Sequence, residues 1–490
     1  MKKGQIAEGV IERVDFPNKG VFTAEDDSRV VVKNTIPGQR VSVRILKARK
    51  GVCEGQLLEV LERSPSEQSV PGCVHAGVCG GCVYQTLSYE DQLRLKSDQV
   101  KRLLDGVIRT EDKDYEFTGA KESPCRYGYR NKMEYSFGDA YKDGPLALGL
   151  HRRGSFYDIV NVPDCKLVDP DFGTVLSITL SYFKERGISY YHKMRHTGYL
   201  RHLLVRRAAK TGEILIDLVT TTGEPKAVRP HEACLGNESS GAVREETEKE
   251  LLAGWMKALL AAEYTGTITG ILHTANDRVA DVIADEGTTV LYGRDYFYEE
   301  LLGLRFLITP FSFFQTNSCG AEVLYETARE FIGDAISVEK TVFDLYSGTG
   351  TIAQVLSAAA GKVTGVEIVE EAVEAARENA KRNHLTNCEF IAGDVLKVLD
   401  SMEECPDFIV LDPPRDGVHP KALAKIIRYG VDQMVYISCK PSSLARDLVT
   451  LQAGGYRVKK AACVDMFPFT ANIEVVVLLQ RCKADKMQKV

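Results

Sequence analysis

Cys439 lies in a stretch whose residue types favour a functional thiol. Residues 436–443 read YISCKPSS, so the cysteine follows an apolar, β-rich run and precedes a Pro-Ser-Ser typical of a helix start. We expect it at the carboxyl end of a strand, the edge where open α/β sheets bind ligands. A thiol there could be a nucleophile, a metal ligand or an inert cysteine, and buried inert cysteines are common.

A Gly-rich turn upstream predicts a nucleotide-like ligand. Residues 344–352 read DLYSGTGTI, which places Gly348 and Gly350 between a predicted strand and a predicted helix. Such a turn lets the backbone approach a ligand beside unpaired N–H groups. It fits a dinucleotide motif only in the Ala-ending form GTGTIA, and it also fits an S-adenosylmethionine site. Either ligand needs a ribose-binding carboxylate roughly 20 residues later, where Glu367 lies. Asp394 ends the next strand, where it could meet the adenine amino group.

The fourth predicted strand of this region limits which methyl-transfer reactions the site could catalyse. It ends in IVLDPPRDG, residues 409–417, whose prolines leave carbonyls and the Asp412 carboxylate at the ligand edge. Amino-group methyltransferases place an aromatic residue after Asp-Pro-Pro, but Arg415 follows here. Cytosine-5 RNA methyltransferases carry a cysteine on this strand as well as the next, and this strand has none. A cysteine on the fifth strand alone suits methylation of carbon 5 of uracil.

Uracil methylation by this route also requires a base. Addition of the Cys439 thiolate to carbon 6 makes carbon 5 nucleophilic enough to take a methyl group from a sulfonium. A base must then remove the proton on carbon 5 before the thiol can leave. Glu474, in MFPFTANIEVVVLL, is the carboxylate that we expect in this role. The alternative is a solvated acid at the end of a strand.

A cysteine cluster in the first third of the chain predicts a metal site. Residues 71–85, PGCVHAGVCGGCVYQ, contain Cys73, Cys79 and Cys82 around a Gly-Gly turn. A fourth ligand is required, and Cys165 in NVPDCKLV is the candidate that we favour. The spacing alone does not distinguish a zinc site from a [4Fe–4S] cluster.

Three regions with different periodicities must position these residues. Residues 4–62 contain short β-rich segments separated by turns, typical of an OB-like barrel. Residues 115–310 read as a mixed α+β region, and from about 340 onward strands alternate with helices, which predicts a doubly wound, Rossmann-like α/β sheet. A helix at 88–104, capped by Ser88, could pack on this last domain. The predicted domains are a barrel at 1–63, a central α+β domain with the metal site at 64–305, and a Rossmann-like domain at 306–490.

Composition and charge limit the cellular setting and the partners. The 490 residues carry a net charge of −6 and 13 cysteines. We find no apolar run of about 18 residues and no apolar signal region, so we expect a cytoplasmic protein without a membrane span. Residues 193–210 contain six Lys or Arg residues and no acid, which predicts either a solvated face or a phosphate-binding surface.

Several motifs together resemble one family. FFQTN (313–317), DLYSGTG, DPPRDG, YISCKP and MFPFTANIEVV are similar in order and spacing to motifs of the uracil-5 RNA methyltransferases. The likeness extends to the iron–sulfur branch that acts on large-subunit ribosomal RNA. TGYLRHLLVR (197–206) and YRNKMEYSF (129–137) resemble its central-domain signatures, and the barrel resembles its RNA-binding TRAM domain. The resemblance covers nearly the whole chain.

The resemblance implies a role for each candidate residue. It implies that Cys439 is the nucleophile and Glu474 the base. It implies that five residues bind S-adenosylmethionine, namely Gln315, Tyr346, Glu367, Asp394 and Asp412. It also implies that four cysteines bind a [4Fe–4S] cluster rather than zinc, namely Cys73, Cys79, Cys82 and Cys165.

The resemblance also implies a substrate, and the chain departs from the family at a few positions. The expected substrate is 23S ribosomal RNA, the product 5-methyluridine and the enzyme a monomer. The alternatives are the same chemistry on tRNA, or a non-catalytic iron–sulfur protein that binds RNA. Ser347 replaces a usual cysteine, and Phe469 and Asn472 replace histidines near the base.

Overall fold

The computed structural model describes residues 1–482 except 69, 113, 226–246, 281, 282, 284, 285 and 403. The chain divides into two compact units. The first unit comprises Met1–Gly72, Cys82–Pro124 and Cys319–Val490, and the second comprises Cys73–Gly81 and Cys125–Ser318. No helix in the described part of the chain is long and apolar enough to cross a membrane.

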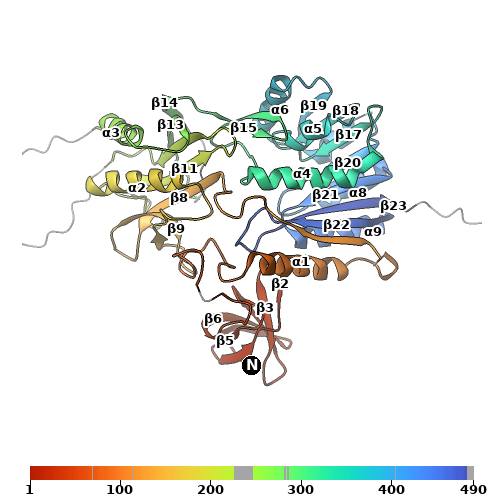
Figure 1. The fold of residues 1–490 in the computed structure, drawn as a ribbon, viewed down its shortest axis with the longest axis horizontal. Coiled ribbons are helices and arrows are strands. Elements are labelled where there is room, and N and C mark those ends of the chain that lie inside the picture. Colours follow the sequence, from red (N-terminus) through yellow and green to blue (C-terminus); the bar gives the residue numbers. More distant parts are fainter. Residues whose placement is uncertain are drawn as a thin grey trace, which may run out of the picture. The chain divides into compact units, whose positions relative to one another are not determined.

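The amino-terminal part of the first unit, which is described in full, is a six-stranded sheet in the order β1-β5-β6-β4-β3-β2. Its strands are drawn in red in Figure 1. The strands are β1 (Ile6–Val10), β2 (Arg13–Asp15), β3 (Lys19–Thr23), β4 (Arg29–Lys33), β5 (Arg40–Arg49) and β6 (Val52–Glu62). β1 and β2 occupy opposite edges of the sheet, yet only Ile11 and Glu12 separate them. The two edges must therefore lie close together, which curls the sheet into a barrel.

The first unit also contains a sheet of eight described strands. They are β7 (Glu116–Lys121), β17 (Thr341–Leu345), β18 (Lys362–Glu367), β19 (Cys388–Ala392), β20 (Phe408–Leu411), β21 (Gln433–Ser438), β22 (Tyr456–Val464) and β23 (Glu474–Arg481). Their order is β19-β18-β17-β20-β21-β23-β22-β7. β17 to β21 are parallel, whereas β23 is antiparallel to both β21 and β22.

Alternating side chains along these strands point to opposite faces of the sheet, and helices cover both faces. Phe343 and Leu345 of β17 join a core cluster with α1, α7, α8 and α9, while the residue between them, Asp344, accepts a hydrogen bond from α5. This alternation confirms the predicted doubly wound sheet. The helices of this unit are α1 (Tyr89–Asp105), α4 (Ser318–Ile332), α5 (Thr351–Leu356), α6 (Glu370–Arg382), α7 (Val395–Ser401), α8 (Pro420–Tyr429) and α9 (Pro441–Ala453).

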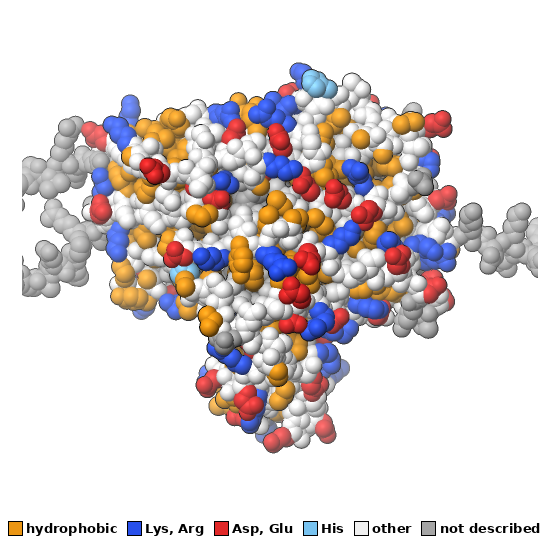
Figure 2. Space-filling model, viewed as in Figure 1, with side chains coloured by type: hydrophobic (Ala, Val, Ile, Leu, Met, Phe, Trp, Pro, Cys, Tyr) orange, Lys and Arg blue, Asp and Glu red, His pale blue; other side chains and the backbone are white. Residues whose placement is uncertain are grey.

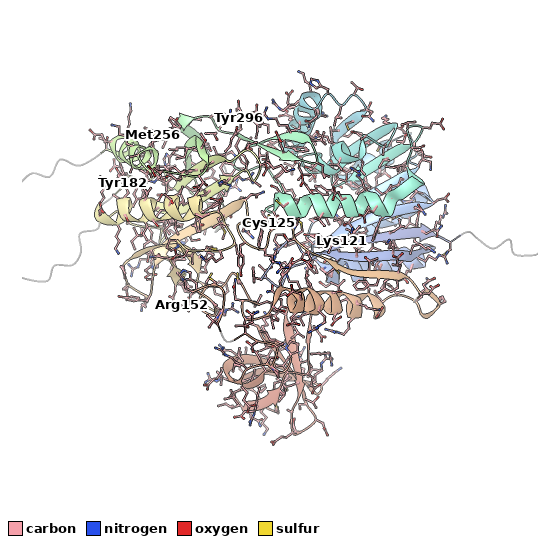
Figure 3. The ribbon with its side chains drawn as sticks, viewed as in Figure 1. Lys121, Cys125, Arg152, Tyr182, Met256 and Tyr296 are labelled. Atoms are coloured by element: carbon pink, nitrogen blue, oxygen red, sulfur yellow. The ribbon has the colours of Figure 1, made fainter. Side chains whose placement is uncertain are left out.

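Helix α1 and strand β7 belong to this unit although they lie in sequence between the two segments of the second unit. Ser88 caps α1 by accepting a hydrogen bond from Asp91 N, as predicted. Val100 and Leu104 of α1 are buried in the core beneath the sheet. Lys121, at the end of β7 and labelled in Figure 3, forms an ion pair with Glu330 of α4 at 2.6 Å. Residues 82–124 thus group with the Rossmann-like sheet because its core buries their apolar side chains.

The second unit contains, in its described residues, a seven-stranded sheet in the order β10-β9-β8-β11-β12-β13-β14, with α2 and α3 packed against it. Tyr182 of α2, labelled in Figure 3, donates a hydrogen bond to the Leu251 carbonyl of α3 at 2.8 Å. The elements are β8 (Lys132–Asp139), β9 (Leu146–His151), β10 (Ile159–Val160), α2 (Pro170–Glu185), β11 (Leu200–Arg207), β12 (Glu213–Thr220), α3 (Glu248–Leu260), β13 (Thr267–Ala275) and β14 (Thr288–Gly293), followed by the hairpin β15 (Phe297–Leu301) and β16 (Leu304–Ile308).

Candidate active site

The predicted catalytic residues lie at one edge of the eight-stranded sheet. Cys439 directly follows β21 and precedes α9, and Asp412 directly follows β20. Glu474 is the first residue of β23, and the antiparallel register pairs Ser438 with Val475. Glu474 therefore lies beside Cys439, because the next position along each strand brings these two residues opposite one another. The strand arrangement thus groups the proposed nucleophile and base.

The proximity of these acids affects the ionisation of Cys439. The thiol is half-buried, and burial, followed by the negative charges of Glu474 and Asp412, raises its pKa to about 11. Arg415 acts in the opposite direction. Cys439 is therefore a protonated thiol at neutral pH in the free protein.

The two neighbouring acids titrate close to neutrality. Burial, together with the charge of Asp412, raises the pKa of Glu474 to about 8, and Arg415 partly offsets the rise. Burial alone raises the pKa of Asp412 to about 7. A carboxyl group whose pKa lies near the working pH can both take up and hold a proton, which is what a general base requires.

The Gly-rich turn leaves buried polar atoms without partners. Asp344 accepts a hydrogen bond from Ala353 N at 2.9 Å through Oδ2, but its Oδ1 has no partner. Burial, then Asp412 and Glu367, raise the pKa of Asp344 to about 8. The buried Ser347 Oγ also lacks a partner. Buried polar atoms are normally hydrogen-bonded, so these two indicate a place for a polar ligand.

The carboxylate at the end of β18 shapes the same turn. Glu367 Oε2 accepts a hydrogen bond from Gly348 N at 3.0 Å. Gly348 and Gly350 have φ angles of 52° and 73°, a region that glycine adopts without strain, and Tyr346 also has a positive φ of 69°. The turn therefore follows a path that its two glycines permit.

Asp394 and Tyr346 lie close to each other at this edge. Asp394 caps α7 by accepting a hydrogen bond from Leu396 N at 2.8 Å. Burial, followed by the charges of Asp394 and Asp447, raises the pKa of Tyr346 to about 12. The structure thus brings together Tyr346, Glu367, Asp394, Asp412, Cys439 and Glu474 of the predicted residues.

The sequence prediction did not include Asp447 of α9, which supports this edge. The buried Asp447 carboxylate accepts hydrogen bonds from Tyr436 Oη at 2.7 Å and Val418 N at 2.8 Å. Ser443 Oγ donates to the Arg415 carbonyl at 2.7 Å. These contacts tie the loop after β20 to β21 and α9. The available signal was an acid on the apolar stripe of a helix, three residues after Leu444.

Gln315 lies in the second unit, so its predicted role in binding the methyl donor stays a prediction. Its carbonyl accepts a hydrogen bond from Asn131 Nδ2 at 2.9 Å. This bond joins the FFQTN segment to the start of β8 within that unit.

The predicted metal ligands are divided between the units. Cys73, Cys79 and Cys165 belong to the second unit, where burial and then the charges of Cys79 and Cys73 raise the pKa of Cys165. Cys82 begins the next segment of the first unit. Among the described residues, no group of three or more His, Cys, Asp or Glu side chains is placed to hold a metal ion. The thiols have the chemistry of cluster ligands.

The basic residues of the segment 193–210 differ in their exposure and in their partners. The buried Arg201 donates to the Asn276 carbonyl, and the buried Arg206 donates to the carbonyls of Thr309 and Ser312. Arg207 contacts Asp169 and Asp171. These three arginines bond to other residues of the same unit, because β11 is buried along nearly its whole length.

Arg195 and Lys210 are the exposed basic residues of this segment, and Lys193 is half-buried. On the face drawn in Figure 2, Lys and Arg side chains are interspersed with Asp and Glu. Both expectations for 193–210, a solvated face and a phosphate-binding surface, are therefore wrong for its three arginines in β11.

Comparison with known proteins agrees with this arrangement. Residues 281–482 match the family model described as tRNA (Uracil-5-)-methyltransferase. An uncharacterized RNA methyltransferase of Caldanaerobacter subterraneus subsp. tengcongensis is 48% identical over 481 residues, covering 98% of this chain and all of that protein. One from Clostridium tetani is 44% identical, covering 98% of this chain and 99% of that protein.

A solved structure extends the likeness to the whole fold. The Pyrococcus abyssi tRNA (uracil-54, C5)-methyltransferase, in complex with S-adenosyl-L-homocysteine, matches with a TM-score of 0.69 and 25% identity, covering 96% of this chain and 100% of that chain. The chain belongs to the uracil-5 RNA methyltransferase family. This uracil-5 RNA methyltransferase uses S-adenosylmethionine as its methyl donor. The unpartnered Asp344 Oδ1 and Ser347 Oγ fit a polar ligand of that kind.

Proposed function

We propose that this uracil-5 RNA methyltransferase makes 5-methyluridine in 23S ribosomal RNA through a covalent bond between Cys439 Sγ and carbon 6 of the uridine. The observation that carries the proposal is the strand register, which sets Glu474 opposite Cys439 at the carboxyl edge of the sheet. The effect of the charges of Glu474 and Asp412 on the pKa of Cys439 supports it. A target base in structured RNA must leave its stack to reach such an edge.

The proposed reaction divides the work between two residues. Cys439 first loses its proton to solvent, and the thiolate adds to carbon 6 while the electron pair of the carbon 5–carbon 6 double bond moves onto the ring as an enolate. Carbon 5 then attacks the methyl group of the donor, and the bond between that methyl group and the donor sulfur breaks. S-adenosylmethionine supplies that methyl group and, before transfer, a positive sulfonium. The Glu474 carboxylate then removes the proton from carbon 5, the double bond re-forms, and the thiolate leaves. With a pKa of about 8, Glu474 can hold this proton at neutral pH.

A covalent trap tests the mechanism. RNA that contains 5-fluorouridine has fluorine in place of the proton that the base removes, so the adduct should persist on a denaturing gel when the donor is present. Cys439→Ala should abolish the adduct, and Cys388→Ala, a matched half-buried thiol in the same sheet, should leave it unchanged. Absence of an adduct in the wild type would contradict the covalent mechanism.

The substrate assignment rests on the cysteine pattern, which resembles the branch acting on large-subunit ribosomal RNA. The same chemistry on tRNA is the second candidate, because the matched Pyrococcus abyssi enzyme and the family description both name tRNA. Mapping 5-methyluridine by mass spectrometry in both RNAs, from cells with and without the gene, separates the two. Loss confined to tRNA would overturn the ribosomal assignment, and no change in either RNA would favour a non-catalytic RNA-binding protein.

We also propose that Cys73, Cys79, Cys82 and Cys165 hold a [4Fe–4S] cluster with a structural or RNA-positioning role. The support is a donor set made only of thiols, three of them grouped in one unit. Anaerobic purification should give a brown protein that contains iron, and Cys165→Ser should lose the colour. A colourless protein with one zinc ion would overturn the assignment.

The remaining parts of the chain have proposed roles in binding RNA. The barrel at 1–63 would act as a TRAM domain that contacts the RNA backbone, together with the half-buried Lys193 and the exposed Arg195 of the second unit. We expect the enzyme to act in the cytoplasm. Salt dependence of RNA binding by Lys193→Ala and Arg195→Ala variants would test the second contact, because each lost phosphate contact lowers the slope.

A further inference from the structure

The loop that leads into Glu474 is held in an unusual way. Residues 465–473 connect β22 to β23, and the strand register places Val464 directly opposite Glu474. Asp465 therefore follows the residue that faces the proposed base. Any contact that holds Asp465 also holds the end of the hairpin from which Glu474 projects.

Lys96 of α1 anchors the start of this loop. Its Nζ forms an ion pair with Asp465 Oδ1 at 2.7 Å and donates to the Phe467 carbonyl at 2.9 Å. Lys96 is 1% exposed and Asp465 is fully buried. Taking both charges out of water is costly, and replacing such a pair by apolar residues is often neutral or stabilising. A gain in stability is therefore a weak explanation for the pair, and an effect on the position of the loop explains it better.

Gln92, one helical turn before Lys96, anchors the middle of the loop. Its fully buried side chain accepts a hydrogen bond from Phe469 N at 2.9 Å. The Phe469 carbonyl accepts hydrogen bonds from Val83 N at 2.8 Å and Tyr84 N at 3.0 Å. Phe469 has a φ of 66°, which is strained for a residue with a Cβ. Such strain persists where the surroundings hold the backbone, and it concentrates at functional sites.

We propose that Lys96 and Gln92 are positioning residues that hold Glu474 against the carbon-5 proton of the RNA adduct. This inference rests on the proposed role of Glu474 as the base. The two residues act through the backbone of residues 465–473 and not on the reacting atoms. Cys439 lies between β21 and α9, outside this loop, so loss of Lys96 or Gln92 should slow proton removal while thiolate addition and methyl transfer continue.

The test follows the covalent intermediate on natural uridine. RNA from cells that lack the gene is incubated with S-adenosylmethionine labelled in the methyl group, and the protein–RNA adduct is measured on a denaturing gel. Lys96→Met and Gln92→Met should accumulate methylated adduct on the order of tenfold or more above wild type, because a small misplacement of a catalytic group slows its step strongly. Lys101→Met, which removes an exposed lysine of the same helix that pairs with Asp105, should behave as wild type.

Two further variants separate positioning from folding and from the assignment of the base. Lys96→Met combined with Asp465→Leu removes the whole buried pair and should fold, yet still accumulate adduct. Recovery of wild-type turnover in this double variant would overturn the proposal, as would equal losses of adduct and product in Lys96→Met. Glu474→Gln should accumulate adduct most strongly. If it does not, the assignment of the base fails, and if it does while Lys96→Met and Gln92→Met do not, only the positioning proposal fails.

Discussion

Removing the charge of Glu474 should lower the pKa of the Cys439 thiol. The change is Glu474→Gln, which keeps the size of the side chain and removes its ionisation. In the wild type Glu474 has a pKa of about 8, so it is ionised before Cys439 titrates at about 11. The thiolate of Cys439 therefore forms beside a carboxylate in the wild type and beside a neutral amide in the variant.

The causes of the raised Cys439 pKa limit the size of the effect. The pKa rises from 9.0 to about 11, with burial as the first cause, Glu474 as the second and Asp412 as the third. Glu474 therefore contributes less than burial does. Solvent reaches the half-exposed thiol and weakens the interaction, so we expect a fall of about half to one pKa unit. Near pH 9.5 this corresponds to roughly three to ten times more thiolate.

Alkylation by iodoacetamide measures this change, because the thiolate is the species that reacts. The rate at each cysteine is followed by peptide mass spectrometry between about pH 8 and 11. Cys388 provides an internal control, because burial raises its pKa to about 11 as well and Glu474 is not among the causes. Identical rate profiles for Cys439 in wild type and variant, or an equal change at Cys388, would refute the reasoning.

Further predictions concern stability and donor binding. The raised pKa of Asp412, about 7 in the folded protein against 3.8 ordinarily, means that the folded state binds more protons, so the free energy of unfolding should fall as pH rises through this window. Urea titrations should show a smaller fall in Asp412→Asn, and an equal fall would contradict this cause. Glu367→Gln should weaken binding of S-adenosylhomocysteine about tenfold or more by calorimetry, since hydrogen bonds to charged groups are the stronger ones; unchanged affinity would exclude it from the donor site. Gly350→Ala should lower the free energy of unfolding by about 2 kcal/mol or more, because φ is 73° and a Cβ would lie 2.5 Å from the Phe390 ring. Gly333→Ala, with a φ of 49° and open space around it, should cost about half as much, and equal losses would show that packing against Phe390 is irrelevant.

The sequence predicted the active-site edge because it predicted where the parallel strands end. Asp412 and Cys439 each follow an apolar run and precede a helix start, so their common edge follows from the parallel arrangement. Glu474 was expected near Cys439 because the chemistry requires a base and the family resemblance supports that role, but neither gives its position in the sheet. That position depends on β23 inserting antiparallel between β21 and β22, a register that local periodicity does not specify.

Charged residues were the least predictable from the sequence. Lys96 and Asp447 lie on the apolar stripes of α1 and α9, where a helical pattern predicts burial but gives no partner. Their partners, Asp465 for Lys96 and Tyr436 for Asp447, are distant in sequence or on another element. Arg201 was predicted as surface charge, and the structure buries it, because a charge run does not reveal that its strand is covered.

By itself the sequence determined which residue types stand at which strand ends, and hence the family, the methyl donor and the choice of Cys439. Those features depend on local periodicity and on the order of the motifs, and both can be read from the sequence without knowledge of the packing. The tertiary structure decided how Glu474 and Asp412 share the edge with Cys439, why their pKa values lie near neutrality, and how α1 holds the loop before Glu474. Burial and contacts between distant segments cause these features, and both exist only once the chain has folded.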